Sequence, residues 1–155
     1  MLVIYDSKTG NTQKMAYAVA EGIKRVGEIT VNVKKVERTT LEDLHAADGI
    51  IIGSPTYYGE LSAKIKDLMD RSVAIHGSLE GKVGAAFTSS GGTASGAETT
   101  LLSIIHVMLV HGMIVQGRSR TAHYGTAAVG APNDDETHLC HDLGERTAQL
   151  VLRIN

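Results

Sequence analysis

The chain has 155 residues, of which 43% are hydrophobic and 21% charged, and its formal net charge at pH 7 is −2. This length fits a single domain over residues 1–155. The small net charge argues against a nucleic-acid partner, and no apolar run approaches the roughly twenty residues that a membrane helix needs. A single cysteine excludes an internal disulfide and cysteine-rich metal or iron–sulfur sites. The apolar start, residues 1–5, is too short for a signal peptide, so we expect a cytoplasmic protein.

Short apolar runs alternate with helical patterns along the whole chain. Five runs predict strands, at residues 2–5, 29–33, 49–53, 83–87 and 113–115. The run at 49–53 has no polar side chain, which is typical of a strand buried on both faces. Strands that alternate with helices form a parallel sheet. The sequence therefore predicts an α/β fold with one doubly wound, five-stranded parallel sheet and helices on both faces.

Three helices are predicted before the fourth strand. Apolar residues recur at helical spacing from Met15 to Val26. Thr40 and Ser62 are predicted N-caps, because their side-chain oxygens can accept hydrogen bonds from the free amides that begin a helix. The apolar stripe of the third helix is Ile65, Leu68, Met69 and Val73.

Two helices and a long loop are predicted after the fourth strand. Residues 98–111 are apolar almost all round, so we expect this helix to be buried on more than one side. Residues 116–132 are expected to form a long loop, and loops of that length in compact domains are usually functional or disordered. The last helix begins near Asp134, and its predicted buried stripe is Leu139, Leu143, Leu150, Val151 and Ile154.

The loop after the first strand, residues 6–12, leads into the first helix. It carries three hydroxyls, an amide and Gly10 at a helix N-terminus, where free backbone N–H groups and the helix dipole favour an anion. Glycine lets the chain curl around a phosphate. The segment contains neither the G-x-x-x-x-G-K-[ST] motif nor the G-x-G-x-x-G motif. A phosphate cradle and an ordinary N-capping turn are the two interpretations.

Ligands of such sheets bind beyond the carboxyl ends of the strands, where the strand order reverses. Two further loops are predicted to lie at this edge. Tyr57 and Tyr58 follow the third strand in a chain with only 4% aromatic residues, and they suit the two sides of a flat aromatic ring. Residues 89–96 offer little bulk and many backbone donors, so a planar ligand could approach closely. The alternatives are tyrosines that cover the core edge and a flexible surface loop.

At these loops the chain resembles two branches of one family. Residues 7–12 resemble the T/S-x-T-G-x-T phosphate signature of flavodoxins. Residues 53–59 and 87–92, followed by 98–101 and 111–113, resemble WrbA-type NAD(P)H:quinone oxidoreductases. The resemblance implies a flavodoxin-like fold, bound FMN and electron transfer through it.

The resemblance also assigns cofactor-binding positions to this chain. The first loop would hold the FMN phosphate, the second would flank the isoalloxazine ring, and the third would lie along its edge. Because the flavin supplies the chemistry, no side chain is predicted to be a catalytic acid or base. The implied cofactor-binding residues, with Tyr124 from the long loop as a further candidate, are Ser7, Lys8, Thr9, Gly10, Asn11, Thr12, Pro55, Thr56, Tyr57, Tyr58, Gly59, Ser89, Ser90, Gly91, Gly92, Thr93 and Tyr124.

Three functions are open at this point. We expect an FMN-dependent electron carrier that serves a redox partner protein. The alternative is an enzyme that takes hydride from NAD(P)H to reduce quinones; that branch usually has longer chains and often a histidine pair before Gly-Met, where this chain reads Val110-His111. A flavin-free binding module of the same fold is the third.

If part of the helix at 98–111 packs against another subunit, the protein is a homo-oligomer; a deep core helix is the competing interpretation.

Histidines and Asp6 invite other interpretations. His138 and His141 could share a helix face, but no third ligand is near in sequence, so we predict no metal site. His106 and His111 are expected to be buried and hydrogen-bonded. Asp6 after the first strand is typical of a phosphoacceptor domain, but the third strand ends without an aspartate, which excludes that interpretation.

Overall fold

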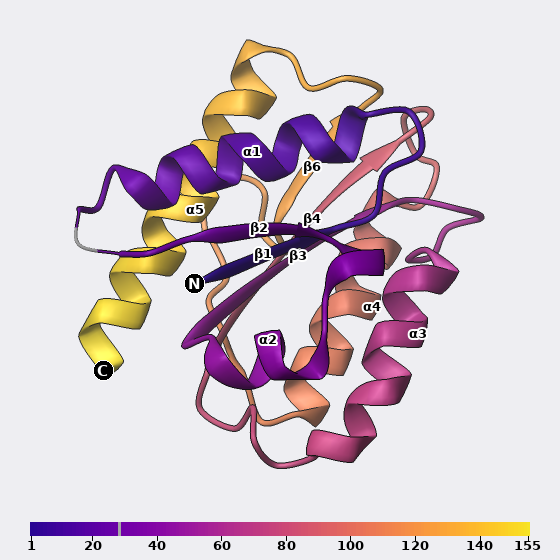
Figure 1. The fold of residues 1–155 in the computed structure, drawn as a ribbon. Helices are drawn as coiled ribbons and strands as arrows, with labels where there is room; N and C mark the ends of the chain where they lie inside the picture. Colours follow the sequence, from indigo (N-terminus) through magenta and orange to yellow (C-terminus); the bar gives the residue numbers. More distant parts are fainter. Residues whose placement is uncertain (28) are drawn as a thin grey trace.

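The computed structural model describes residues 1–27 and 29–155, which form one twisted sheet between two layers of helices (Figure 1). The strands are β1 (Leu2–Tyr5), β2 (Asn32–Lys35), β3 (Gly49–Pro55), β4 (Val83–Ser90), β5 (Ile114–Val115) and β6 (Thr126–Val129). The α-helices are α1 (Asn11–Lys24), α2 (Leu41–Ala46), α3 (Ala63–Arg71), α4 (Ala97–Val110) and α5 (Asp134–Ile154). Two short 3₁₀ helices, η1 (Val36–Arg38) and η2 (Ser72–Ile75), complete the regular elements of the described chain.

The strand order is β2-β1-β3-β4-β5, with β6 also paired to β4, and each of these pairings is parallel. Helices α1 and α5 cover one face, and α2, α3 and α4 cover the other (Figure 1). The chain runs from β1 outward to β2 and then returns to β3 on the other side of β1, so the strand order reverses between β1 and β3. The predicted doubly wound parallel sheet is confirmed.

The centre of the sheet is the pairing of β3 with β4, and both strands are buried along their whole length. Gly53 lies directly opposite Phe87 in this register. A Cβ on Gly53 would stand 2.1 Å from the Phe87 ring, so a side chain at position 53 would displace the ring. The two core clusters on either side of these strands are formed by the helices that the sequence pattern predicted.

Two strand predictions need correction. The second strand, expected at 29–33, runs over Asn32–Lys35, where Val33 pairs with Val3 of β1. Alternation of apolar and polar residues indicates which side chains face the core but does not locate the strand ends. The expected loop at 116–132 contains β6, which pairs with the second half of β4 while β5 pairs with its start. The fifth position of the sheet is therefore shared by two short strands.

The N-cap predictions are confirmed. Thr40 accepts a hydrogen bond from the backbone N–H of Asp43, and Ser62 accepts one from that of Ile65.

Among the described residues, no helix combines the length and the apolarity that crossing a membrane requires.

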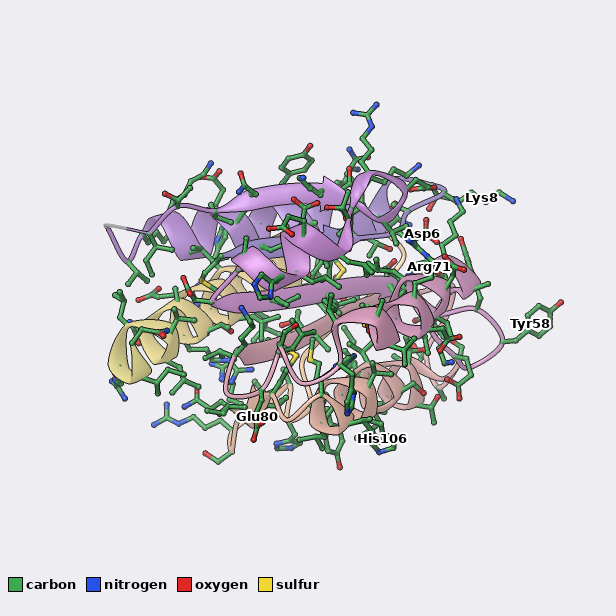
Figure 2. The ribbon with its side chains drawn as sticks, turned by 60° about the horizontal axis from the view of Figure 1, so that its bottom comes forward. Asp6, Lys8, Tyr58, Arg71, Glu80 and His106 are labelled. Carbon is green, nitrogen blue, oxygen red and sulfur yellow. The ribbon has the colours of Figure 1, made fainter. Side chains whose placement is uncertain are left out.

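Within the single chain, the helix predicted at 98–111 is buried on one side only, so the interpretation as a deep core helix is wrong. Its buried residues face the sheet on one side, and Leu109 and Val110 are 55% and 74% exposed. His106, expected to be buried, is exposed on the same helix (Figure 2). A groove of about 550 Å³ lies between the end of α4 on one side and α3 with the segment that follows it on the other. An apolar helix surface is therefore left uncovered in the single chain.

Two other burial predictions are also wrong. Val73, predicted on the stripe of the third helix, lies in η2 and is 73% exposed, because α3 ends at Arg71. Ile154, predicted on the buried stripe of the last helix, is 43% exposed in the last turn of α5.

His111 follows α4 and is buried and hydrogen-bonded, as predicted. The Ser72 hydroxyl donates to the Met69 carbonyl at 2.6 Å, so it accepts from His111 Nε2 at 2.8 Å. Nδ1 of His111 then carries no proton, and it has no hydrogen-bond partner in the described part of the chain. Burial, and to a smaller extent the nearby His76, lower the pKa of His111 from its ordinary value of 6.5.

The burial of His111 predicts that the protein loses stability as the pH falls. Below about pH 6.5 the unfolded chain takes up a proton that the folded imidazole resists, so the free energy of unfolding falls as the pH falls. His111→Gln should weaken this dependence, whereas His106→Gln, on the exposed side of α4, should retain it. Urea unfolding at about pH 7.5 and about pH 5.5 measures the difference. The same pH dependence in the parent and in His111→Gln would contradict the assignment.

Candidate functional site

Three loops meet at the carboxyl edge of the sheet, beside the point where the strand order reverses. They follow β1, β3 and β4. Thr12 Oγ1 of α1 and Ser89 Oγ of β4 lie 2.8 Å apart, and the hydroxyls of Thr56 and Thr88 lie 2.9 Å apart. These two contacts, the first of them buried, join the ends of the elements that carry the loops. The structure therefore brings the three predicted loops together.

The first loop leads into a helix that lacks a side-chain cap. Gly10 is the N-cap residue, with φ +91°, and its backbone N–H donates a hydrogen bond to the Ser7 hydroxyl at 3.1 Å. This turn of the loop leaves the first amides of α1 without a side-chain acceptor. The helices α2, α3 and α5 are capped by Thr40, Ser62 and Asn133, whereas α4, like α1, begins after a glycine without a side-chain cap. Free N–H groups at the positive end of a helix dipole form a site for an anion.

The other polar residues of this loop differ in exposure. Thr9 and Lys8 are exposed, and Lys8 points away from the body of the protein (Figure 2). Asp6 is buried, its N–H donates to the Gly53 carbonyl at 3.1 Å, and its carboxylate lies 3.8 Å from Lys64 Nζ. The ammonium group of Lys64 offsets part of the negative charge next to the candidate anion site.

The second loop turns back on itself between Tyr57 and Glu60, which exchange two backbone hydrogen bonds of 2.9 and 3.0 Å. The central residues Tyr58 and Gly59 both have positive φ angles, +51° and +80°. This is the pattern of a type I′ turn. Tyr58 is fully exposed at its tip and points into solvent, and Tyr57 is 43% exposed (Figure 2). The pair is therefore free to contact a ligand.

The third loop begins where β4 ends. Ser89 and Ser90 are buried, and the Ser90 hydroxyl donates to the Gly92 carbonyl at 2.9 Å. No atom lies within 4 Å of where a Cβ would stand on Gly91 or on Gly92. The same is true of Gly10 in the first loop. Glycines of two loops therefore border open space at this edge.

Tyr124 is the one predicted site residue that the structure does not bring to the edge. Thr126 pairs with Phe87, and a Cβ on Gly125 would stand 2.2 Å from the Ala86 carbonyl oxygen. Tyr124 therefore lies beside the middle of β4, some way below Ser90. It lines a separate hollow of about 360 Å³ together with Glu98 and His123.

The segment before Tyr124 is anchored to α5. The Arg118 guanidinium contacts the Asp142 carboxylate at 2.8 Å, and Arg146 donates to the Gln116 carbonyl at 2.8 Å. Burial lowers the pKa of Arg146 from its ordinary value. Arg118 and Arg146 therefore have a structural role, because they join the segment before β6 to α5.

Two residues of α4 contact the second loop and were not among the predicted site residues. The Thr99 hydroxyl donates to the Gly59 carbonyl, and the Ser103 hydroxyl donates to the Glu60 carboxylate. These partners are 40 and 43 positions apart in sequence, so no local pattern could have indicated the contacts. Within the described residues, no group of three or more His, Cys, Asp or Glu side chains could hold a metal ion.

Comparison with known proteins agrees with this geometry. Residues 32–127 match the family model described as NADPH-dependent FMN reductase. A flavodoxin of Aquifex aeolicus (strain VF5) is 40% identical over 97% of this chain and 86% of its own length. An NAD(P)H dehydrogenase (quinone) of Archaeoglobus fulgidus is 35% identical over 99% of this chain and 98% of its own. The crystal structure of a WrbA-like flavodoxin from Agrobacterium tumefaciens superimposes with a TM-score of 0.85 at 25% identity, covering 99% of this chain and 98% of that one.

The chain belongs to the flavodoxin-like family. The predicted family and fold are confirmed, and a flavodoxin-type function has the same support. Membership of this family implies a flavin cofactor, and either redox partners or NAD(P)H and a quinone.

Proposed function

We propose that this flavodoxin-like protein binds FMN and carries electrons between redox partners in the cytoplasm. The observation that carries the proposal is the uncapped N-terminus of α1. Its free amides, the exposed hydroxyl of Thr9 and the open space beside Gly10 fit a phosphate group. A cytoplasmic location is consistent with Cys140, a free thiol that is buried and whose pKa burial raises to about 12.

The two other loops fit the flavin ring. Tyr57 and Tyr58 offer aromatic surface, and the backbone of Gly91 and Gly92 offers donors without side-chain bulk next to open space. Bound FMN supplies the electron-transfer chemistry, and the protein's residues bind it, orient it and set its polar surroundings. No side chain in this proposal acts as an acid or a base. The proposed contacts are those of the predicted loop residues, without Tyr124.

Two observations favour a carrier over a quinone reductase. The alignment with the flavodoxin of Aquifex aeolicus spans 159 residues, close to the 155 of this chain, whereas that with the Archaeoglobus fulgidus dehydrogenase spans 188. The dehydrogenase therefore contains segments that this chain lacks. In addition, His111 is buried against Ser72 at the far end of α4, about 20 Å of helix from the loops.

The phosphate cradle predicts a difference between FMN and riboflavin. The parent should bind FMN more tightly than riboflavin, and Thr9→Ala should weaken FMN binding about tenfold or more while leaving riboflavin affinity unchanged. A hydrogen bond to a charged group contributes about 1.5–3 kcal/mol, and a factor of ten corresponds to about 1.4 kcal/mol. Fluorescence titration of the flavin-free protein measures both constants.

Thr121→Ala is the control, because Thr121 is exposed and lies in the loop before β6. It should bind both flavins as the parent does. Equal losses of FMN and riboflavin affinity in Thr9→Ala would place the phosphate elsewhere, and FAD as the cofactor extracted from the purified protein would refute FMN.

The carrier proposal predicts slow turnover with nicotinamide nucleotides. The FMN-loaded protein should oxidise NADH or NADPH with a quinone at negligible rates, and should accept electrons rapidly from a flavodoxin reductase. Steady-state absorbance of the nucleotide measures the first rate, and the flavin spectrum under anaerobic conditions measures the second. Sustained quinone-dependent oxidation of NAD(P)H would contradict the carrier proposal and indicate a quinone reductase instead.

We also propose that two copies of the chain pack through the uncovered side of α4. The exposed part of this helix, around Leu109 and Val110, is apolar, and α4 has no charged residue after Glu98. Two such surfaces can meet without burying an unpaired charge. A large exposed apolar patch is typical of an interaction surface.

The dimer is tested by charge. Static light scattering at micromolar concentration should give a dimer for the parent and a monomer for Val110→Glu, because the new carboxylate would be buried unpaired in the interface. Ala74→Glu, an exposed position on neighbouring η2, shows whether any added charge nearby has this effect. A strictly monomeric parent would rule out the dimer.

A further inference from the structure

Hydrogen bonds hold both ends of the turn between Tyr57 and Glu60 and the Gly59 carbonyl, but not its central peptide. Tyr57 and Glu60 use both their N–H and carbonyl groups in hydrogen bonds to each other, and the Gly59 carbonyl accepts from Thr99. Among residues 1–27 and 29–155, no hydrogen bond reaches the Tyr58 carbonyl or the Gly59 N–H. The peptide that joins Tyr58 to Gly59 is therefore the unbound unit of the turn.

The support for this turn comes from the beginning of α4. A Cβ on Gly96 would stand 2.4 Å from the Gly59 Cα, so the backbones of the two loops are in direct contact. One turn later, Thr99 reaches the Gly59 carbonyl, and a further turn along the helix Ser103 reaches the Glu60 carboxylate. The turn lies along one side of α4, against residues 96, 99 and 103.

Thr99 has one hydroxyl proton and two acceptors. Its Oγ1 lies 2.5 Å from the Gly59 carbonyl oxygen and 2.9 Å from that of Gly96. Because one proton serves one acceptor, bonding to Gly96 within the helix competes with bonding to the turn. The shorter distance favours the turn.

We propose that Thr99 is a positioning residue of the cofactor site, which holds the Gly59 carbonyl and so keeps the turn closed against α4. This inference rests on the proposed function, because the turn lies where the flavin ring is proposed to bind. Thr99 does not contact the flavin in this proposal. It acts through the turn, whose tyrosines can flank the ring only while the turn is in place.

The position of Tyr58 provides a direct measure of this effect. Tyr58 is fully exposed, and a protease specific for aromatic residues cleaves there only when the turn opens. When opening is fast compared with cleavage, the rate follows the population of the open form. Loss of one hydrogen bond should raise this population about twofold to tenfold.

The experiment compares the flavin-free full chain with Thr99→Val, in which a methyl group replaces the hydroxyl at nearly constant shape. Chymotrypsin should release the fragments ending at Tyr57 or Tyr58 about twofold to tenfold faster from the variant. Titration should show that the affinities for FMN and for riboflavin fall equally, because the turn contacts the ring and not the phosphate. This pattern differs from that of Thr9→Ala, which should affect FMN alone.

Three variants serve as controls. Thr99→Ser retains the hydroxyl and should restore the parent's cleavage rate and flavin affinities. Thr121→Val makes the same chemical change on an exposed loop and should behave as the parent. Thr99→Ala removes the hydroxyl with different packing, and should match Thr99→Val; urea unfolding shows whether either variant is globally less stable.

The outcomes separate this inference from the proposed function. Cleavage and flavin affinities of Thr99→Val and Thr99→Ala equal to the parent's, with FMN bound by the parent, would overturn the role of Thr99 and leave the proposed function intact. Failure of Thr99→Ser to restore the parent's behaviour would also overturn it. A parent that binds no FMN would overturn the proposed function, and the role of Thr99 in flavin binding with it.

Discussion

The Phe87 ring lies across Gly53, and the position of the candidate site depends on this contact. The two residues face each other in the pairing of β3 with β4, and a Cβ at position 53 would overlap the ring. Because the ring fills this space, a slip of one residue in the register would set Phe87 against Ser54 or Ile52 and turn its side chain to the other face. The contact therefore fixes the register that carries the ends of both strands to the same height. The loops that follow β3 and β4 meet because their strands end together.

The sheet was predictable because its buried strands are short apolar runs. The run at 49–53 and the run at 83–87 contain few residues that could face water, and the structure buries both. β6 was missed because its sequence, Thr-Ala-Ala-Val, has one bulky apolar residue and little alternation. What places it in the sheet is Gly125, whose lack of a side chain lets the chain pass against the Ala86 carbonyl. That contact joins segments far apart in sequence, so local patterning cannot indicate it.

Helix α4 shows how far an apolar pattern can be interpreted. Its composition predicts burial but not what covers it. Of the two interpretations, a deep core helix is wrong, because the sheet covers only one side and Val110 is 74% exposed. Hydrophobicity around the whole helix has the same signature whether the second partner is another helix of the chain or a second subunit. The same reasoning explains His106, which shares the uncovered surface.

The candidate site was predictable to the extent that single loops determine it. Gly10, the tyrosine pair and the glycines after β4 are local signals, and parallel topology alone brings their loops together. Tyr124 was placed with them because it lies in a long segment. The register of β6 with β4 sets it lower on the sheet. The contact of Thr99 with Gly59 arises only after α4 has packed on the sheet and Gly96 has met the turn. A support of this kind is absent from every local window of the sequence, although it acts on residues that the sequence does identify. Packing of α4 on the sheet and order in the loop after β3 are thus coupled, since the helix that covers β4 also holds the turn in that loop.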